Sequence, residues 1–495
     1  MSYLEKYFLS VSKDNQSKAA VAYLAALDYI KEENPLIAEK IIQELRDQRS
    51  HVKLIASENY SSLAVQLAMG NLLTDKYCEG FPGKRFYAGC ENVDAIEFSA
   101  VNELKNLFGA EHAYVQPHSG IDANLLAFWA ILVEKVQNKE LEKLSRKTVD
   151  ELSPEEYELI RQSLVNQKMM GLALGSGGHL THGYRHNISS KMMQSVSYEV
   201  DRATGLIDYA ALQGQVKKER PLILVAGYSS YPRLINFAKM KEIADSVGAV
   251  LLVDMAHFSG LVAGKVMQGE FNPVPYADIV TSTTHKTLRG PRGGFILCKS
   301  TFKDVVDKGC PLVLGGPLPH VIAAKAIAFK EASTASFRDY AKQIVLNAKT
   351  LASSLMQKGV KLTTDGTDNH LLVIDVAKSF GLTGRQAETA LSECCFTANR
   401  NAVPFDVNGA WYTSGVRLGT AAVTTLGMKE KEMEEIADCI YRLLKACRPA
   451  FSEKENEVSR AKVTIEPGIL AEVKRRGNDL LSQFPLYPEL VLNEK

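Results

Sequence analysis

Strand-length apolar runs alternate with amphipathic stretches of helical length through the middle of the chain. From Met169 onward the strand-length runs are MMGLAL, SVSYEV, LILVAG and AVLLV, and the helical stretches between them include DYAALQGQVKKE and FAKMKEIADSVG. Strands that alternate with helices in this way are typical of a parallel sheet whose two faces are both covered by helices. The pattern therefore predicts an α/β fold with a large, mainly parallel, doubly wound sheet.

Helical periodicity dominates the two flanking regions. The segments AVAYLAALDYI and LIAEKIIQELRDQ predict a helical N-terminal arm over residues 1–50, and RDYAKQIVLNAKTLASSLMQKG predicts a long amphipathic helix soon after residue 330. The strand-like segment NHLLVIDV follows that helix. We therefore expect three parts, which are the arm, a large domain over 51–330 and a smaller C-terminal α+β domain over 331–495.

A charged segment at about 131–168 interrupts the α/β rhythm. It contains SPEEYELIRQSLV, in which Ser153 and Pro154 form a typical helix start and Tyr157, Ile160 and Leu164 share one face. The segment is expected to be a helical insertion in the large domain. A solvated helix explains its charges better than a docking site does.

The composition narrows the class of protein. The chain has 495 residues, and 58 Lys and Arg side chains nearly balance 57 Asp and Glu side chains, which favours neither nucleic acid nor an anionic membrane as a partner. The eight cysteines form no CxxC pair, so we expect reduced thiols and predict no metal site. The charged amino terminus and the lack of an apolar run of ~18 residues predict a soluble, cytoplasmic protein.

The stretch ADIVTSTTHKTLRGPRGG, residues 277–294, carries the strongest chemical signal. A β-branched strand runs into His285 and Lys286 and then into a glycine-rich turn that ends at Gly294. A lysine that is desolvated beside cationic groups has a lowered pKa and can condense with an aldehyde to form a Schiff base. Because a lone loop lysine is more often solvated, this interpretation needs a second observation.

The second observation is Asp254, which ends the apolar run AVLLV. It falls at the carboxyl end of a buried parallel strand, where open α/β sheets place their sites. A lysine that forms an imine and an aspartate that holds a pyridinium nitrogen are the two protein groups that pyridoxal 5'-phosphate requires. VDMAH followed by TSTTHKT resembles the serine hydroxymethyltransferase family, whose members are pyridoxal-phosphate enzymes with the aspartate-aminotransferase-like fold, fold type I.

The resemblance implies a cofactor site built from several segments. Lys286 would carry the cofactor as a Schiff base, Asp254 would hold the ring nitrogen, and His179 in GGHLTHG would stack on the ring. Ser119 and Gly120, at the start of an apolar helix, are expected to bind the phosphate through free backbone N–H groups. The other implied contacts are Ser229 and His257 near the phenolic oxygen, His285 beside the phosphate, and Tyr77, Gly315 and Gly316 toward the cofactor of a partner subunit.

The loop over residues 75–94 matches the family's KYxEGxPGxRYYxG signature. The match implies that Glu79 moves a proton at the hydroxymethyl carbon of the substrate and that Tyr87 and Ser57 line the amino-acid pocket. Arg417 corresponds to the substrate-carboxylate clamp, since a guanidinium binds a carboxylate bidentately. The expected catalytic residues are Lys286, Glu79, His179, Asp254, Arg417, Tyr87 and His285, and the expected folate-binding residues are Leu174, Gly178, Leu180 and Asn401.

Three positions depart from the family pattern. Ile121 stands where the family usually has a hydroxyl residue next to the phosphate, and Ala421 and Leu426 stand where relatives often have Pro and Arg. The first change leaves only a backbone N–H at that position for the phosphate. The other two alter the outer edge of the expected carboxylate pocket. The resemblance otherwise covers roughly residues 40–450, apart from the insertion.

The expected protein is thus a pyridoxal-phosphate-dependent enzyme, at least a homodimer, that reversibly transfers the hydroxymethyl group of serine to tetrahydrofolate and leaves glycine and 5,10-methylenetetrahydrofolate. One alternative is a threonine aldolase, which shares the lysine and the aspartate but lacks a folate site; the GGHLTHG and EGxPG strings weigh against it. The other is a regulatory or binding protein, even an RNA-binding one, on the same fold. Near-neutral charge and the presence of Lys286, Asp254 and Arg417 disfavour it.

Overall fold

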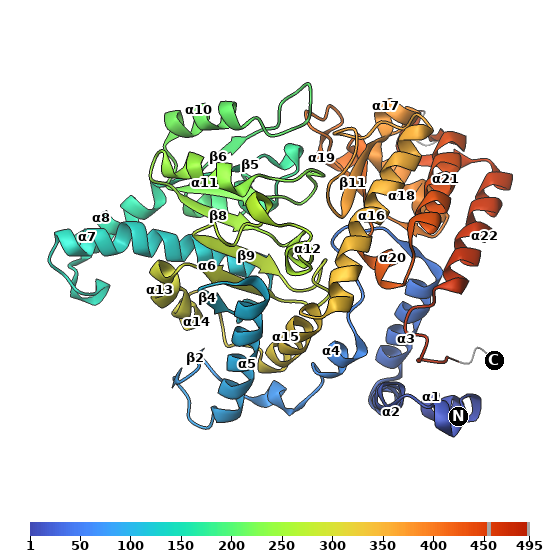
Figure 1. The fold of residues 1–495 in the computed structure, drawn as a ribbon, viewed down its shortest axis with the longest axis horizontal. Helices are drawn as coiled ribbons and strands as arrows, with labels where there is room; N and C mark the ends of the chain where they lie inside the picture. The colour runs from blue at the N-terminus through green and yellow to red at the C-terminus, as the bar shows by residue number, and fades with distance from the viewer. Residues whose placement is uncertain (453–456, 493–495) are drawn as a thin grey trace.

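A seven-stranded sheet forms the centre of the computed structural model, which describes residues 1–452 and 457–492 (Figure 1). β10 runs antiparallel to both of its neighbours, and the other adjacent strands are parallel, so the sheet is mainly parallel as predicted. In spatial order the strands are β4 (His112–Tyr114), β10 (Gly294–Cys298), β9 (Ile279–Thr283), β8 (Val250–Asp254), β7 (Ile223–Gly227), β5 (Lys168–Leu172) and β6 (Gln194–Tyr198).

Both faces of this sheet are buried, which explains the continuous apolar runs. On β7, Ile223 and Val225 pack into the core that contains α6, whereas Leu224 and Ala226 pack into the opposite core with α5, α10 and α11. The helices of this part are α4 (Leu63–Leu67), α5 (Glu91–Phe108), α6 (Gly120–Leu132), α9 (Ser189–Met192), α10 (Tyr209–Glu219), α11 (Phe237–Asp245), α12 (Ser259–Ala263), α13 (Lys303–Asp307), α14 (Gly309–Leu312) and α15 (Pro319–Ala332).

The first 50 residues are helical, as the periodicity predicts. The arm consists of α1 (Tyr3–Ser10), α2 (Lys18–Glu33) and α3 (Pro35–Ser50). Leu24 of α2 and Ile42 of α3 share a core with Leu486 and Leu490 near the other end of the chain. The arm is therefore fixed to the body of the same subunit by apolar packing.

A second core forms around the three-stranded antiparallel sheet β11-β14-β13. Further two-stranded pairs are β1 with β12 and β15 with β16. The elements are β1 (Val52–Lys53), β11 (Leu371–Asp375), α17 (Val376–Phe380), α18 (Gly384–Glu393), β12 (Phe396–Thr397), β13 (Asn399–Asn401), α19 (Gly409–Tyr412), β14 (Gly415–Gly419), α20 (Ala421–Thr425), α21 (Glu430–Ala446), β15 (Cys447–Ser452), β16 (Glu457–Ile465) and α22 (Pro467–Gln483).

Two segments connect the central and C-terminal cores. The long helix α16 (Ala335–Gln357) contributes Ile344 to the core of the large sheet and Leu351 to the second core. β1 pairs in parallel with β12, so the chain just after the arm also belongs to the second core. A division at residues 50 and 330 stays our proposal, and α16 runs across both units.

The charged segment at 131–168 projects from the body at the left of Figure 1. A π-helical turn over Val133–Gln137 continues α6 into α7 (Asn138–Lys143), and α8 (Pro154–Val165) follows with Ser153 and Glu156 forming a capping box. Ile160 is buried, but Tyr157 on the same expected face is half-exposed. Val133 and Leu164 pack on the core that contains α6, so apolar contacts join the segment to the body near both of its ends.

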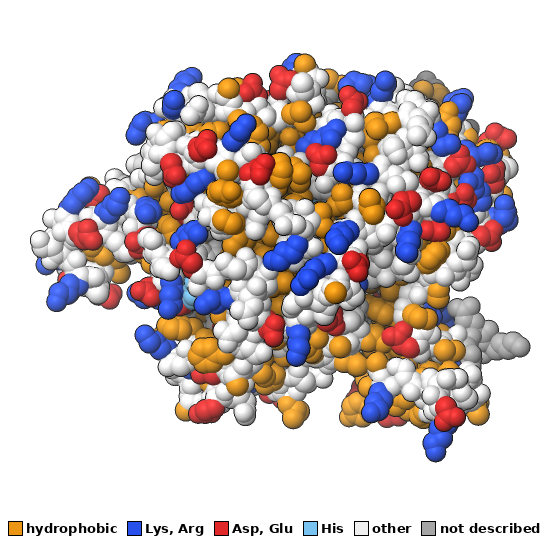
Figure 2. Space-filling view, in the orientation of Figure 1, with side chains coloured by type: hydrophobic (Ala, Val, Ile, Leu, Met, Phe, Trp, Pro, Cys, Tyr) orange, Lys and Arg blue, Asp and Glu red, His pale blue; other side chains and the backbone are white. Residues whose placement is uncertain are grey.

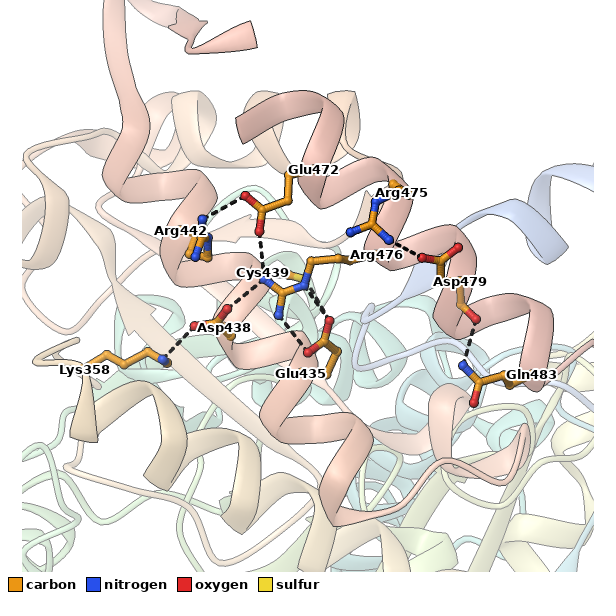
Figure 3. Close-up of polar contacts among 10 residues, drawn as sticks. All are labelled: Lys358, Glu435, Asp438, Cys439, Arg442, Glu472, Arg475, Arg476, Asp479 and Gln483. Carbon is orange, nitrogen blue, oxygen red and sulfur yellow. Dashed lines mark hydrogen bonds and ion pairs between the residues drawn. The ribbon is translucent and has the colours of Figure 1, made fainter. Parts of the chain in front are cut away.

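Arg476 of α22 contacts three carboxylates, two of which lie on α21 and join the two helices (Figure 3). Its guanidinium donates to Glu435 at 2.6 and 2.7 Å and to Asp438 at 2.8 Å, and it lies 3.4 Å from Glu472 on its own helix. Lys358, just after α16, donates to Asp438 at 2.8 Å. The side chain of Arg476 is only 16% exposed, so these pairs are less screened than ordinary surface pairs.

We expect Arg476→Ala to lower the free energy of unfolding by about 1–2 kcal/mol, because several charge-assisted bonds are lost from a partly buried network. Urea denaturation measures the change. Arg475→Ala is the matched control on the same helix, since Arg475 is 67% exposed and Asp479 is its one ion-pair partner among the described residues. Its effect should stay below about 0.5 kcal/mol. Equal losses in the two variants would contradict a special role for the network.

Charges of both signs are interspersed over the face shown in Figure 2. Among the described residues, no helix is long and apolar enough to cross a membrane. All eight cysteines are free, and seven of them are buried.

Candidate active site

Two adjacent parallel strands place Lys286 and Asp254 in one cavity. Asp254 is the last residue of β8, and Lys286 lies three residues after the end of β9. The turn after Lys286 is one residue shorter than predicted, because Gly294 already begins β10. The cavity measures about 310 Å³, and the predicted site residues that line it are Ser57, Ser119, Gly120, His179, Ser229, Asp254, His257, His285 and Lys286.

Asp254 is a buried carboxylate held by donors. His182 donates to it at 3.2 Å, Asn124 at 2.9 Å, and the backbone N–H of Ala256 at 3.0 Å. Burial by itself would raise its pKa, but the hydrogen bond and charge of His182, with His179 and Asn124, hold the pKa well below its ordinary value. Asp254 is therefore ionised, as a partner for a protonated ring nitrogen must be. Although His179, His182 and Asp254 bring possible metal ligands within 4.8 Å of one another, these donors already satisfy the carboxylate.

Lys286 is a desolvated amine, and no carboxylate of the described residues is bonded to it. Its Nζ donates to Thr283 at 3.3 Å, and its backbone carbonyl accepts from Asn59 at 2.9 Å. Burial lowers the pKa of Lys286 to about 8, helped by Arg417 and Arg292 and opposed by Asp254. A substantial fraction of the amine is thus neutral and nucleophilic near neutral pH.

One edge of the cavity is suited to a phosphate. Ser119 caps α6, and the backbone N–H groups of the first turn, at Gly120 and Ile121, have no partner within the helix. Gly120 packs closely, since a Cβ there would lie 2.7 Å from Cγ2 of Thr283. His285 has a buried Nδ1 with no hydrogen-bond partner in the described structure, and Arg292 adds a positive charge to the same lining.

Two neutral imidazoles border the cavity. Burial lowers the pKa of His179 to about 4, with Asp254 opposing, and Nδ1 of His179 lies 2.8 Å from Oγ1 of Thr181. Burial also lowers the pKa of His257 well below its ordinary value, together with Lys286 and Arg417. Nε2 of His257 lies 3.5 Å from Oγ of Ser229. Both rings can therefore contact a flat ligand without carrying charge.

Arg417 is a partly buried cation that makes no ion pair within the described residues. It lies on β14 of the C-terminal sheet and donates to the backbone carbonyl of Ser229 at 2.6 Å and to Oδ1 of Asn399 at 3.2 Å. Burial lowers the pKa of its guanidinium to about 10. A partly buried guanidinium with donors to spare beside a cavity is suited to a carboxylate ligand.

The structure does not bring Glu79 into this cavity. The 75–94 loop contains a small hairpin, β2 (Gly80–Phe81) with β3 (Lys84–Arg85), which buried ion pairs from Arg85 to Asp94 and Glu97 anchor to α5. On its exposed side, Tyr77 and Tyr87 donate to the two carboxylate oxygens of Glu79 at 3.2 and 3.3 Å. A Cβ on Gly316 would touch the Tyr77 ring at 3.4 Å, and Gly315 lies next to it. These five residues form one exposed cluster, which we call the outer cluster.

The predicted folate residues lie partly on a neighbouring pocket. Leu174 lines a pocket of about 340 Å³ that shares His179 with the main cavity, and Leu174 and Leu180 are each about 40% exposed. Gly178 fits tightly against the chain, since a Cβ there would lie 1.9 Å from the carbonyl oxygen of Leu172. This glycine is therefore required for packing whatever it binds. Asn401 lies on β13, and its amide donates to the carbonyl of Ala402 at 2.7 Å.

Several residues of the site escaped the sequence argument. Asn124 and His182 bind the carboxylate of Asp254, although they come from a helix and a loop far from it in sequence. Glu58 lines the cavity as well, and so does Arg292, one of the cationic groups expected beside Lys286. The one feature of the sequence that could have placed His182 in the site is its proximity to His179 in the GGHLTHG string. Asn124 could not be recognised, because an amide inside an apolar helix carries no signature.

Comparison with known proteins identifies the family. The family model for serine hydroxymethyltransferase matches residues 30–142 and 156–440 and thus leaves out part of the helical insertion. The protein named serine hydroxymethyltransferase from Treponema pallidum is 59% identical over 489 residues, which cover 99% of this chain and 85% of that protein. Proteins of the same name from Chlamydia muridarum, 54% identical over 99% of both chains, and Cutibacterium acnes, 53% identical over 97% of this chain and 98% of the relative, also match. The chain belongs to the serine hydroxymethyltransferase family.

Proposed function

We propose that the protein reversibly transfers the hydroxymethyl group of serine to tetrahydrofolate and leaves glycine and 5,10-methylenetetrahydrofolate. The observation that carries this assignment is the cavity in which Lys286 and Asp254 lie on adjacent strand ends, next to a partly buried Arg417 with no ion pair among the described residues. Family membership supports it. A threonine aldolase would not explain matches to this family over nearly the whole chain.

The cavity residues fit pyridoxal 5'-phosphate. Lys286 would hold it covalently, Asp254 would bind the ring nitrogen, and Ser119 and Gly120 would bind the phosphate with His285 nearby. His179 would lie against the ring, and Ser229 and His257 beside its phenolic oxygen. The bound group supplies an electron-withdrawing ring that stabilises the charge left on the amino acid when a bond at its α-carbon breaks.

The remaining roles belong to side chains of this protein. Arg417 would bind the carboxylate of serine and so fix which bond at the α-carbon faces the ring. Ser57 and Tyr87 would line the amino-acid pocket. Glu79 would move the proton of the serine hydroxyl as the hydroxymethyl carbon leaves for tetrahydrofolate. Leu174, Gly178, Leu180 and Asn401 would border the folate.

The outer cluster supports a homodimer with shared sites. Tyr77 and Tyr87 are exposed, Glu79 is partly exposed, and all three are absent from the lining of the cavity in their own subunit, while Gly316 lies against Tyr77. We therefore place Glu79 and Tyr87 in the site of the partner subunit, with Tyr77, Gly315 and Gly316 near the partner's cofactor. The cytoplasmic location expected from the free cysteines stays a prediction.

Wild-type protein should form glycine from serine only when tetrahydrofolate is present, whereas an aldolase would need none. Glu79→Gln should lower that turnover by about 10²-fold or more, because a proton-transfer group is lost, while the visible absorption of the loaded enzyme stays unchanged. Glu91→Gln, at an exposed acid of the same loop where α5 begins, is the matched control and should retain full activity. If folded Glu79→Gln protein no longer bound the cofactor, Glu79 would have a structural role. If the wild type formed no glycine from serine, the proposed function would be refuted.

Mixed subunits test the shared site directly. In a hybrid dimer, one subunit carries Glu79→Gln and the other carries Lys286→Ala. If each site takes Lys286 from one subunit and Glu79 from the other, one of the two sites combines the two unmutated residues and is intact. Because half of randomly paired dimers are hybrids, remixing should restore about one quarter of wild-type activity. If each site used Glu79 and Lys286 of the same subunit, remixing would restore nothing.

A further inference from the structure

His370 lies outside the lining of the cavity but bonds to a residue that lines it. It immediately precedes β11 of the C-terminal sheet and is completely buried. Its Nε2 lies 3.2 Å from Nδ1 of His257, on the far side of that ring from Ser229. His370 therefore reaches the large sheet from the other core.

Both rings are neutral, so one hydrogen atom is shared between them. Burial lowers the pKa of His370 to about 3, together with Arg417 and Lys286, and the backbone of Ala56 opposes the shift. Nδ1 of His370 has no hydrogen-bond partner among the described residues, so the bond to His257 is the contact that fixes its ring. Whichever ring donates in that bond, Nδ1 of His257 is engaged by His370, and only Nε2 of His257 is left for the hydroxyl of Ser229.

The resulting chain of bonds joins the two cores at the site. Ser229 contacts His257 through its hydroxyl and accepts from Arg417 through its backbone carbonyl at 2.6 Å. His370 immediately precedes β11, and Arg417 lies on β14, the strand that pairs with β11. The backbone of His370 is itself fixed, because its carbonyl accepts from the N–H of Thr420 at 3.0 Å.

We propose that His370 is a positioning residue that holds His257 in one ring orientation and one tautomer, so that Nε2 of His257 orients the Ser229 hydroxyl at the edge of the cavity. The catalytic purpose of this role rests on the proposed function, whereas the contact between His370 and His257 does not depend on it. His370 does not touch the cavity and acts only through His257. Removing such a supporting partner commonly costs about 10- to 100-fold in affinity or activity.

Histidine-selective ¹⁵N NMR tests the proposal. Wild-type protein should show His257 in a single neutral tautomer. His370→Phe, which keeps the volume of the ring without its nitrogens, should lose that single tautomer. In the same variant the visible band of the loaded enzyme should shift and turnover should fall about 10- to 100-fold. The KM for serine should change less than about threefold, since Arg417 is untouched. His370→Gln, which offers an acceptor to His257, should restore the tautomer and most of the turnover.

Leu371→Ala separates positioning from stability. Leu371 is the next residue and is fully buried, so its truncation leaves a cavity beside His370 and lowers the melting temperature. It should leave the His257 tautomer and the visible band as in the wild type. If His370→Phe does not fold, His370→Asn, too short to reach His257, takes its place. An unchanged tautomer and band in either folded variant would overturn the proposal, whereas failure to convert serine in the wild type would refute only the function.

Discussion

Replacing Lys286 with alanine is expected to lower turnover on the order of 10³-fold or more, because the covalent attachment is lost. Borohydride reduction of wild-type protein, followed by peptide mapping, should leave a pyridoxyl group on Lys286. The Lys286→Ala variant should carry no such label and should release its cofactor on dialysis. A label on another lysine would refute the assignment.

Lys325 is the strongest alternative to Lys286 as the site of the pyridoxyl label. Burial lowers its pKa to about 7, further than that of Lys286, with Glu97 opposing. Its amine, however, donates to the backbone carbonyls of Val115, Pro117 and Gly294 and is absent from the cavity lining. An amine with a low pKa cannot act as a nucleophile when it does not reach the cavity. Lys325→Met should therefore leave the pyridoxyl label on Lys286 unchanged.

The pKa of Lys286 also fixes the pH dependence of covalent capture. The neutral amine reacts, and it is depleted below a pKa of about 8. The rate at which cofactor-free protein captures added pyridoxal phosphate should therefore rise up to about pH 8 and then level off. A solvated lysine with a pKa near 10.4 would keep gaining about tenfold per pH unit beyond that point.

The elements that place the site could be predicted from the sequence because their signals are local. The apolar run ending at Asp254 and the β-branched run before Lys286 each define a strand, and parallel pairing then brings the two ends together. Ser119 at the start of an apolar helix likewise marks an N-terminus. Each inference needed only a few neighbouring residues.

The rest depended on contacts between distant segments. No local pattern shows that Asn124 and His182 stabilise the Asp254 carboxylate, or that His370 supports His257 across 113 residues. Nor does periodicity reveal that β1 pairs with β12, because two-residue strands carry no period. The position of Glu79 outside its own cavity was not anticipated, because the family resemblance directed only Tyr77, Gly315 and Gly316 toward a partner subunit.

Arg417→Gln should lower kcat/KM for serine by about 10²- to 10³-fold, since a buried charge pair with the substrate carboxylate is lost, at about 2–5 kcal/mol. Most of the loss should lie in KM, because the guanidinium binds the carboxylate in both the ground and the transition state. Arg400→Gln is the matched control on the adjacent strand β13, where Arg400 pairs with Glu388 at the surface of the protein. It should change kcat/KM less than about threefold. Serinol, which lacks the carboxylate, should react equally slowly with wild-type and Arg417→Gln protein. If Arg417→Gln protein kept the wild-type selectivity for serine over serinol, the carboxylate of serine would bind elsewhere in the site. The role of Arg417 would then be limited to its hydrogen bond with the backbone of Ser229.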